Sequence, residues 1–155
     1  MTGFIEWCQT NAFSQLMNSA KWPFPAVEIF HIAGLVLIFG SMLVLNLRIF
    51  GRMLRAQPVP QVARGLAPVT KFGLVGQIVS GPLLFMNAAM RLSENTSFRL
   101  KMLLLIIALS YHFAVHLPLA LDSEGPAFRL RLSATVSMLL WISMTLAGFS
   151  IQLLP

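Results

Sequence analysis

Charged residues and cysteines are both scarce in this sequence of 155 residues. Only 10% of the residues are charged, whereas a typical soluble domain carries about 25%. So few charges cannot cover a water-facing surface, which excludes an ordinary soluble domain. The single cysteine, Cys8, excludes an intramolecular disulfide and a cysteine-rich metal site. We interpret Cys8 as a small apolar residue.

The sequence also lacks the common catalytic motifs. It contains no glycine-rich phosphate loop, no HExxH pair and no credible Ser-His-Asp set. No basic stripe is interleaved with aromatic residues, so the net charge of +6 does not indicate nucleic-acid binding. The N-terminus lacks a basic region followed by a short apolar core, so we expect no cleavable signal peptide.

Long apolar runs dominate instead, because 57% of the residues are hydrophobic. A membrane-spanning helix needs about 20 mostly apolar residues, and four runs are long enough. The sequence therefore predicts an all-α integral membrane protein, a four-helix transmembrane bundle that forms a single domain. The predicted spans cover residues 24–47, 69–90, 98–121 and 132–154.

Breaker residues separate the predicted spans. Pro58, Pro60 and Pro68 indicate the first loop, and the segments SENT (93–96) and DSEGP (122–126) indicate the other two. Pro82 should kink the second span. Residues 3–20 differ, because apolar side chains recur at roughly helical spacing among polar ones. They predict a short N-terminal amphipathic helix lying in the membrane interface.

The lysines and arginines are distributed unevenly over the two sides of this bundle. With four spans, both termini and the middle loop lie on one side. That side holds Lys21, Arg91, Arg99 and Lys101. The other side holds Arg48, Arg52, Arg55, Arg64, Lys71, Arg129 and Arg131. The positive-inside rule therefore predicts a cytoplasmic location for the first and third loops, with both termini facing the periplasm or exterior.

Ionisable residues inside the spans are the candidate functional residues, because a bilayer makes them costly. Glu28 and His31 lie three residues apart on the first span and share a face. Glu28 could orient the imidazole, or it could be a partly hydrated residue near the helix start. His112 and His116 lie four residues apart on the third span and could ligate one metal ion. Alternatively, each histidine could have the purely structural role of hydrogen-bonding one helix to another.

Imidazole ligands favour haem, copper or zinc over a hard cation. Haem b fits best, because a four-helix bundle offers an apolar slot and histidine is the usual axial ligand. We expect His31 and His112 as ligands, with His116 as a substitute. Their expected depths differ by about 9 Å, so two separate sites are an alternative. Lys101 and Arg48 could pair with haem propionates, an anionic substrate or a quinone oxygen, or simply extend to the head groups.

Three segments of the chain carry a resemblance to a known family. The first span opens with WPxPxxExxHxxG (22–34) and closes with NLRIFG (46–51), and the third begins with FRLKM (98–102). This pattern resembles an uncharacterised family of bacterial four-helix inner-membrane proteins. The resemblance covers nearly the whole chain from Trp22 and implies a location in the bacterial inner membrane. No function follows from it directly.

A more distant resemblance is to the HemJ-type protoporphyrinogen oxidases. It rests on His31 followed by RIF (48–50), and on Lys101 followed by Tyr111 and His112. CopD-type copper-resistance membrane proteins are similar at a vaguer level. HemJ-type proteins are small helical membrane proteins that bind haem b, and a histidine of helix one and a lysine of helix three are important there. The resemblance implies these roles for His31 and Lys101.

Four hypotheses for the function remain open at this point. The leading one is a b-type haem protein of the inner membrane that acts in electron transfer or oxidation. The second is a HemJ-like porphyrinogen oxidase, and the third is a non-haem copper or zinc site or carrier. The fourth is a structural subunit of a larger membrane complex. The expected partners are the lipid bilayer and, beyond it, other membrane subunits or electron-transfer proteins, but no nucleic acid.

Overall fold

The computed structural model describes residues 3, 7, 8, 10, 14, 15, 21–122 and 125–153. Four helical segments in this part of the chain are long and apolar enough to cross a membrane, and no strand occurs in it. The four segments are α3 (Pro23–Ile49), α4 (Val59–Asn87), the continuous stretch Thr96–Leu121, and α8 (Ala127–Leu153). The predicted all-α bundle of four spans is confirmed. The interfacial helix predicted for residues 3–20 lies largely outside the described residues.

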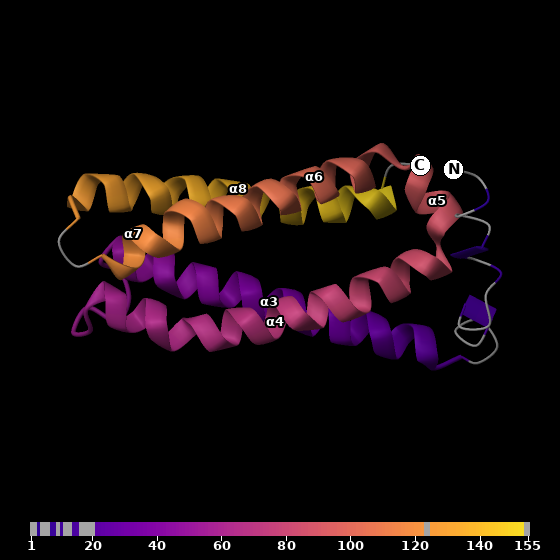
Figure 1. Ribbon diagram of the computed structural model, residues 1–155, viewed down its shortest axis with the longest axis horizontal. Helices are drawn as coiled ribbons and strands as arrows, with labels where there is room; N and C mark the ends of the chain where they lie inside the picture. Colours follow the sequence, from indigo (N-terminus) through magenta and orange to yellow (C-terminus); the bar gives the residue numbers. More distant parts are fainter. Residues whose placement is uncertain are drawn as a thin grey trace.

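The second span begins earlier than the sequence suggested. Pro58 precedes α4, Pro60 lies in its first turn, and Pro68 lies inside the helix rather than in a loop. A proline is tolerated in a first turn because its missing N–H would have no intrahelical partner there. The cations Arg64 and Lys71 interrupt the apolar run without ending the helix, because both side chains are exposed. Figure 1 shows α4 as a bent helix, consistent with its internal prolines Pro68 and Pro82.

Short helical pieces complete the second and third spans. The helix α5 (Ala89–Glu94) follows a break at Ala88, and Asn95 then caps the third span by accepting a 3.0 Å hydrogen bond from the Phe98 amide. The third span consists of α6 (Thr96–Tyr111), a π-helical turn (His112–His116) and α7 (Leu117–Leu121). The predicted loop at 93–96 is therefore reduced to little more than a helix cap.

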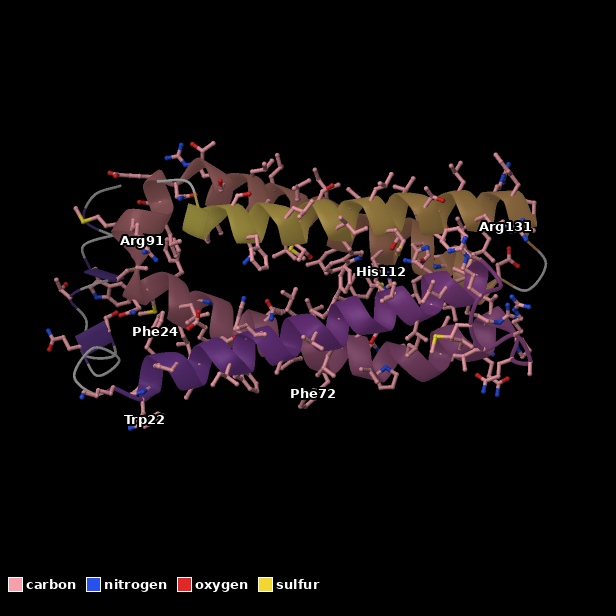
Figure 2. The ribbon with its side chains drawn as sticks, turned by 180° about the vertical axis from the view of Figure 1, so that it is seen from behind. Trp22, Phe24, Phe72, Arg91, His112 and Arg131 are labelled. Atoms are coloured by element: carbon pink, nitrogen blue, oxygen red, sulfur yellow. The ribbon has the colours of Figure 1, made fainter. Side chains whose placement is uncertain are left out.

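The four spans form two antiparallel pairs (Figure 1). The helix α3 packs along α4 and α6 packs along α8, while α3 against α8 and α4 against α7 join the pairs. The ribbons of the two pairs diverge toward α5 and approach each other toward α7. We name these the α5 end and the α7 end. Figure 2 shows Trp22 and Arg91 at the α5 end and Arg131 at the α7 end.

Glycines allow the close approach of α3 and α4. A Cβ added to Gly73 would lie 2.8 Å from the Gly34 carbonyl oxygen and 2.9 Å from Cγ1 of Ile38, so no side chain fits there. Small residues at such crossings let helix backbones pack tightly in lipid. Gly40 lies on the same helix as Gly34 but has nothing within 4 Å of its added Cβ, so it takes no part in the contact.

The outer surface of the bundle is apolar. Phe72, Phe128 and Phe149 are each at least 68% exposed, and Phe72 points away from the bundle in Figure 2. Large apolar side chains on the outside of all four spans are stable in lipid but not in water. The protein is therefore a multi-pass membrane protein.

Candidate functional site

The three histidines lie at two different depths in the bundle. His31 of α3 is hydrogen-bonded to Ser80 of α4, whereas His112 lines a cavity together with Thr70 of α4. Ser80 and Thr70 are ten residues apart, which is about 15 Å along the helix. The structure therefore does not bring together His31 and His112, the expected ligand pair of one haem. The alternative of two separate sites agrees with the geometry.

A serine fixes the ring of His31 at the α5 end. The Ser80 hydroxyl donates its only proton to the Gly76 carbonyl at 2.6 Å. Its oxygen lies 2.8 Å from His31 Nδ1, so it accepts from an Nδ1–H group. We infer that Nε2 of His31 carries an unprotonated lone pair. Gln77 also donates to the backbone carbonyl of His31, which ties α3 to α4 at this level.

Lys101 reaches the same region from the other helix pair. It lies in the second turn of α6, which begins at the α5 end. The aliphatic part of Lys101 lies against Gly148 of α8, where an added Cβ would be 3.6 Å from the lysine Cδ. Gly81 of α4 likewise lies beside His31: a Cβ added to it would be 3.7 Å from Cε1 of the His31 ring. Both glycines thus lie directly beside the histidine and the lysine.

Two phenylalanines bridge the helix pairs near this site. The rings of Phe85 on α4 and Phe98 on α6 are stacked, with centroids 5.7 Å apart and planes tilted by 20°. Phe98 lies one turn before Lys101 on the same helix. The region between His31 and Lys101, which we call the α5-end site, is therefore bounded by aromatic side chains on the side of α5.

Glu28 is not the partner of His31 Nδ1, and Arg48 lies at the other end of the bundle. The hydrogen-bond partner of His31 Nδ1 is Ser80, not Glu28. Arg48 lies at the α7 end, where its Nε donates to the Gln57 carbonyl at 2.6 Å and braces the loop between α3 and α4. It is therefore too distant to serve a ligand bound at His31.

The other two histidines belong to a buried polar cluster near the α7 end. We call the following residues the α7-end cluster: Ser41, Asn46, Thr70, His112, His116, Ser133 and Ser137. His112 and His116 are only 3% and 0% exposed. Figure 2 shows His112 between the helices, nearer to Arg131 than to Trp22. A group of polar side chains this deeply buried in a membrane bundle is a candidate functional site.

A second serine fixes the ring of His116. Ser133 donates to the Leu130 carbonyl at 2.9 Å, and its oxygen lies 3.1 Å from His116 Nδ1. By the same reasoning as for His31, Nε2 of His116 is unprotonated. That atom has no hydrogen-bond partner among the described residues, nor do His112 Nδ1 and Asn46 Oδ1. The cluster therefore holds three buried polar atoms that are available to a water molecule or a ligand.

The space inside this cluster is small. A cavity of about 20 Å³, measured as the space open to the centre of a water-sized sphere, is lined in part by Ser41, Thr70, Lys71 and His112. A buried water needs roughly 10–15 Å³ by this measure. The cavity therefore has room for a water molecule but not for a porphyrin.

The π-helical turn accounts for the position of both imidazoles. Pro118 lacks an N–H group and its ring crowds the carbonyl four residues earlier, which the wider turn relieves. The Leu117 amide accordingly donates to the His112 carbonyl, five residues back. The two imidazole centroids lie 5.8 Å apart. Single π-helical turns occur frequently at functional sites.

A family model described as a family of unknown function (DUF6644) matches residues 4–153. The chain belongs to this family. No curated protein and no solved structure matches it. The family match agrees with the resemblance to an uncharacterised membrane family, and it provides no link to HemJ-type or CopD-type proteins.

The described side chains of this DUF6644 protein do not gather three or more of the usual metal-ligating residues. Among residues 21–122, 125–153 and the few described before them, no group of three or more His, Cys, Asp or Glu residues could hold an ion. The copper or zinc set expected from Glu28, His31, His112 and His116 is not formed, because its members lie at two depths.

Sequence reasoning missed the residues that position the histidines in this DUF6644 protein. Ser80 and Ser133 hold the two rings, while Gly81 and Gly148 leave space at the α5-end site. Ser80 and Gly81 were recognisable only as small residues on one helix face. Their pairing with His31 depends on how α4 is rotated against α3, which apolar periodicity does not determine when both helices are apolar all round.

Proposed function

We propose that this protein is a membrane-embedded b-type haem protein that acts in electron transfer or oxidation, with its haem at the α5-end site. The observation that carries the proposal is that His31 of α3 and Lys101 of α6, which belong to different helix pairs, both lie toward the α5 end of the bundle. They are also the two positions that the resemblance to HemJ-type proteins singles out. His31 would be an axial ligand, and Lys101 would pair with a propionate.

The chemistry of these donors fits a haem. Iron ligation requires a neutral imidazole with a free lone pair, and the hydrogen bond to Ser80 leaves that lone pair on His31 Nε2. A lysine ammonium suits the propionates, and the neighbours of the two residues on α4 and α8, Gly81 and Gly148, carry no side chain. When bound, the haem would supply a one-electron carrier within the bilayer.

The α7-end cluster fits a haem less well. His116 offers a free Nε2, but the adjoining cavity of about 20 Å³ is closed to a porphyrin. The proposal therefore assigns the haem to His31 alone among the three histidines. His112 and His116 keep a role as a buried polar pair.

The same two residues support a second candidate, a HemJ-like porphyrinogen oxidase. Lys101 would bind a propionate of the substrate, which is an anionic tetrapyrrole like haem itself. The test is complementation of a bacterial strain that lacks its own porphyrinogen oxidases. Wild type should relieve the accumulation of porphyrin precursors, while Lys101→Gln should not. Unchanged precursor pools with wild type would eliminate this candidate.

The distribution of basic residues supports a location in the bacterial inner membrane with the α7 end in the cytoplasm. Arg52, Arg55, Arg129 and Arg131 all lie at that end and are exposed. Positive residues accumulate on the cytoplasmic side of membrane proteins. Both termini would then face the periplasm, where electron-transfer proteins or partner subunits could reach the α5-end site. Fusion of a periplasm-specific reporter to the C-terminus would test this orientation.

The test of the haem proposal is a pair of visible spectra. The protein is produced in haem-supplemented cells, purified in detergent, and recorded in its oxidised and dithionite-reduced states. We expect a Soret band and reduced α and β bands. Lys101→Gln should weaken haem retention, whereas Lys21→Gln, a control outside the spans, should not. A flat visible spectrum from monodisperse wild-type protein would overturn the proposal.

A further inference from the structure

Lys71 is an exposed cation far from either end of its helix. It lies twelve residues after Val59, the first residue of α4, which is about 18 Å along the helix. The 29 residues of α4 make it about 43 Å long, whereas the hydrocarbon core of a bilayer is about 30 Å thick. An α4 centred in the bilayer therefore places the backbone of Lys71 about 11 Å inside the hydrocarbon core.

The third span supports this depth. His112 lines the same cavity as Lys71, and it precedes Leu121, the last residue of that span, by nine residues or about 14 Å. Lysine carries its charge on a flexible four-carbon stem, which is shorter than the depth of Lys71 in the core. Extension toward the α7 end therefore does not by itself bring the ammonium group to the head groups. A charge at this depth requires a partner, because the bilayer makes an unpaired one costly.

The chain itself offers Lys71 no partner at this depth. Among the residues that the structure describes, none forms a hydrogen bond or an ion pair with Lys71. The described acidic residues lie elsewhere: Glu28 and Glu94 are toward the α5 end, and Asp122 follows the last residue of α7. A second copy of the chain in the same orientation would carry these three residues at the same depths. The surrounding membrane, however, supplies one anion in quantity, which is the phosphate of a phospholipid.

The face of α4 that carries Lys71 matches the polarity of a phospholipid. Arg64 lies seven residues earlier, two turns nearer the α7 end, and is also exposed. Val75 and Ile78 lie four and seven residues after Lys71 and are 59% and 63% exposed. Residues at these spacings share one face of a helix. The face is therefore basic toward the α7 end and apolar toward the α5 end, which is the order of head group and acyl chains in the adjacent leaflet.

We propose that this face of α4 binds an anionic phospholipid. Its phosphate would lie between Arg64 and Lys71, and its acyl chains would run along Val75 and Ile78. Two cations without an acidic neighbour favour a lipid of net negative charge over a zwitterionic one, because they repel the cationic group of the zwitterionic head. This inference is independent of haem and of the proposed function.

Native mass spectrometry of the purified protein tests this lipid selection. The protein in detergent is given equal amounts of phosphatidylglycerol and phosphatidylcholine with the same acyl chains. We expect one phosphatidylglycerol to be retained in preference to phosphatidylcholine. Lys71→Gln and Arg64→Gln should each weaken its binding about fivefold, which corresponds to about 1 kcal/mol. Lys71→Arg should preserve the binding, because the positive charge is kept.

Arg131→Gln is the matched control. Arg131 is exposed at the same end of the bundle, but it lies on α8, which packs against helices other than α4 in the described part of the chain. Its loss should leave the retained phosphatidylglycerol unchanged. A photoreactive phosphatidylglycerol, with its reactive group on an acyl chain, should form cross-links to residues 72–78 of wild-type protein.

Several results would overturn the inference. They are equal retention of the two lipids by wild type, unchanged binding in both Lys71→Gln and Arg64→Gln, and cross-links to helices other than α4. An equal loss in Arg131→Gln would also overturn it, because the preference would then be a general response to the basic end of the bundle. A second protein that copurifies with wild type and is lost in Lys71→Gln, with phosphatidylglycerol retention unchanged, would assign Lys71 to a protein partner instead.

Discussion

His31 and His116 are held in the same way at opposite ends of the bundle, yet their surroundings differ. Each ring is hydrogen-bonded through Nδ1 to a serine whose proton is committed to a backbone carbonyl, and each Nε2 is left with a free lone pair. At the α5 end, the space beside the ring is bordered by Gly81. At the α7 end, the cavity admits only a water. The two histidines therefore differ in the packing around them rather than in the way that their rings are held.

The side chains between the helix pairs account for this difference in spacing. At the α7 end, Ala63, Ala120 and Ala134 are at most 1% exposed and form part of one apolar cluster. Side chains this small let the two pairs come together. At the α5 end, the pairs are bridged by the stacked rings of Phe85 and Phe98 instead. The large rings hold the two helix pairs farther apart at the α5 end than the alanines do at the α7 end.

The largest expected effect comes from filling the open space at the α5 end. Gly148→Leu would place a side chain against Lys101, where the site proposed for haem lies. We expect nearly complete loss of bound haem, measured as the ratio of haem to protein. Gly40→Leu is the control, since the added Cβ of Gly40 meets nothing within 4 Å and should leave haem content unchanged. Full haem content in Gly148→Leu would show that the haem lies elsewhere.

Replacing the two serines should have a smaller effect on haem binding, and the effect should differ between the two ends. Ser80→Ala removes the group that orients His31, and loss of such a partner typically lowers metal affinity by about 10–100-fold. Ser133→Ala removes the matching group from His116 and should leave haem affinity unchanged. Haem titration into apoprotein measures both. Equal losses in the two variants would contradict the assignment of the haem to the α5 end.

A substitution in the contact between α3 and α4 should lower the stability of the protein and leave its choice of ligand unchanged. Gly73→Ala forces a Cβ to within 2.8 Å of the Gly34 carbonyl. Overpacking of this kind costs about 1–3 kcal/mol. We expect a lower thermal midpoint in detergent, with Gly40→Ala unaffected. An unchanged midpoint for Gly73→Ala would mean that the helix pair is less tightly packed than described.

The four spans could be predicted from the sequence because length and hydropathy determine them. The start of α4 could not be predicted, because exposed cations such as Arg64 resemble loop residues in the sequence. A helix tolerates such cations at the membrane boundary at little cost in free energy. The π-helical turn also escaped prediction. Pro118 signalled a local disturbance, but several backbone adjustments can accommodate a missing N–H, and only the packing around His112 selects one of them.

The candidate site was only partly predictable for a related reason. The histidines are recognisable because ionisable residues are rare in membrane spans, and Lys101 was singled out by resemblance. The expected depth difference of about 9 Å between His31 and His112 was counted from uncertain helix ends, whereas their neighbours on α4, Ser80 and Thr70, lie about 15 Å apart along that helix. Their serine partners depend on helix rotation. Apolar residues surround each helix, so the sequence carries little signal for that rotation.

The most direct test of the haem assignment compares the haem content of His31→Ala and His116→Ala. Both variants are produced in haem-supplemented cells, purified in the same detergent, and checked for folding by size exclusion and circular dichroism. We expect His116→Ala to retain the Soret band and the reduced α band of the wild type, and His31→Ala to lose both. Retention of haem in folded His31→Ala, with loss in His116→Ala, would contradict the account and move the haem to the α7 end.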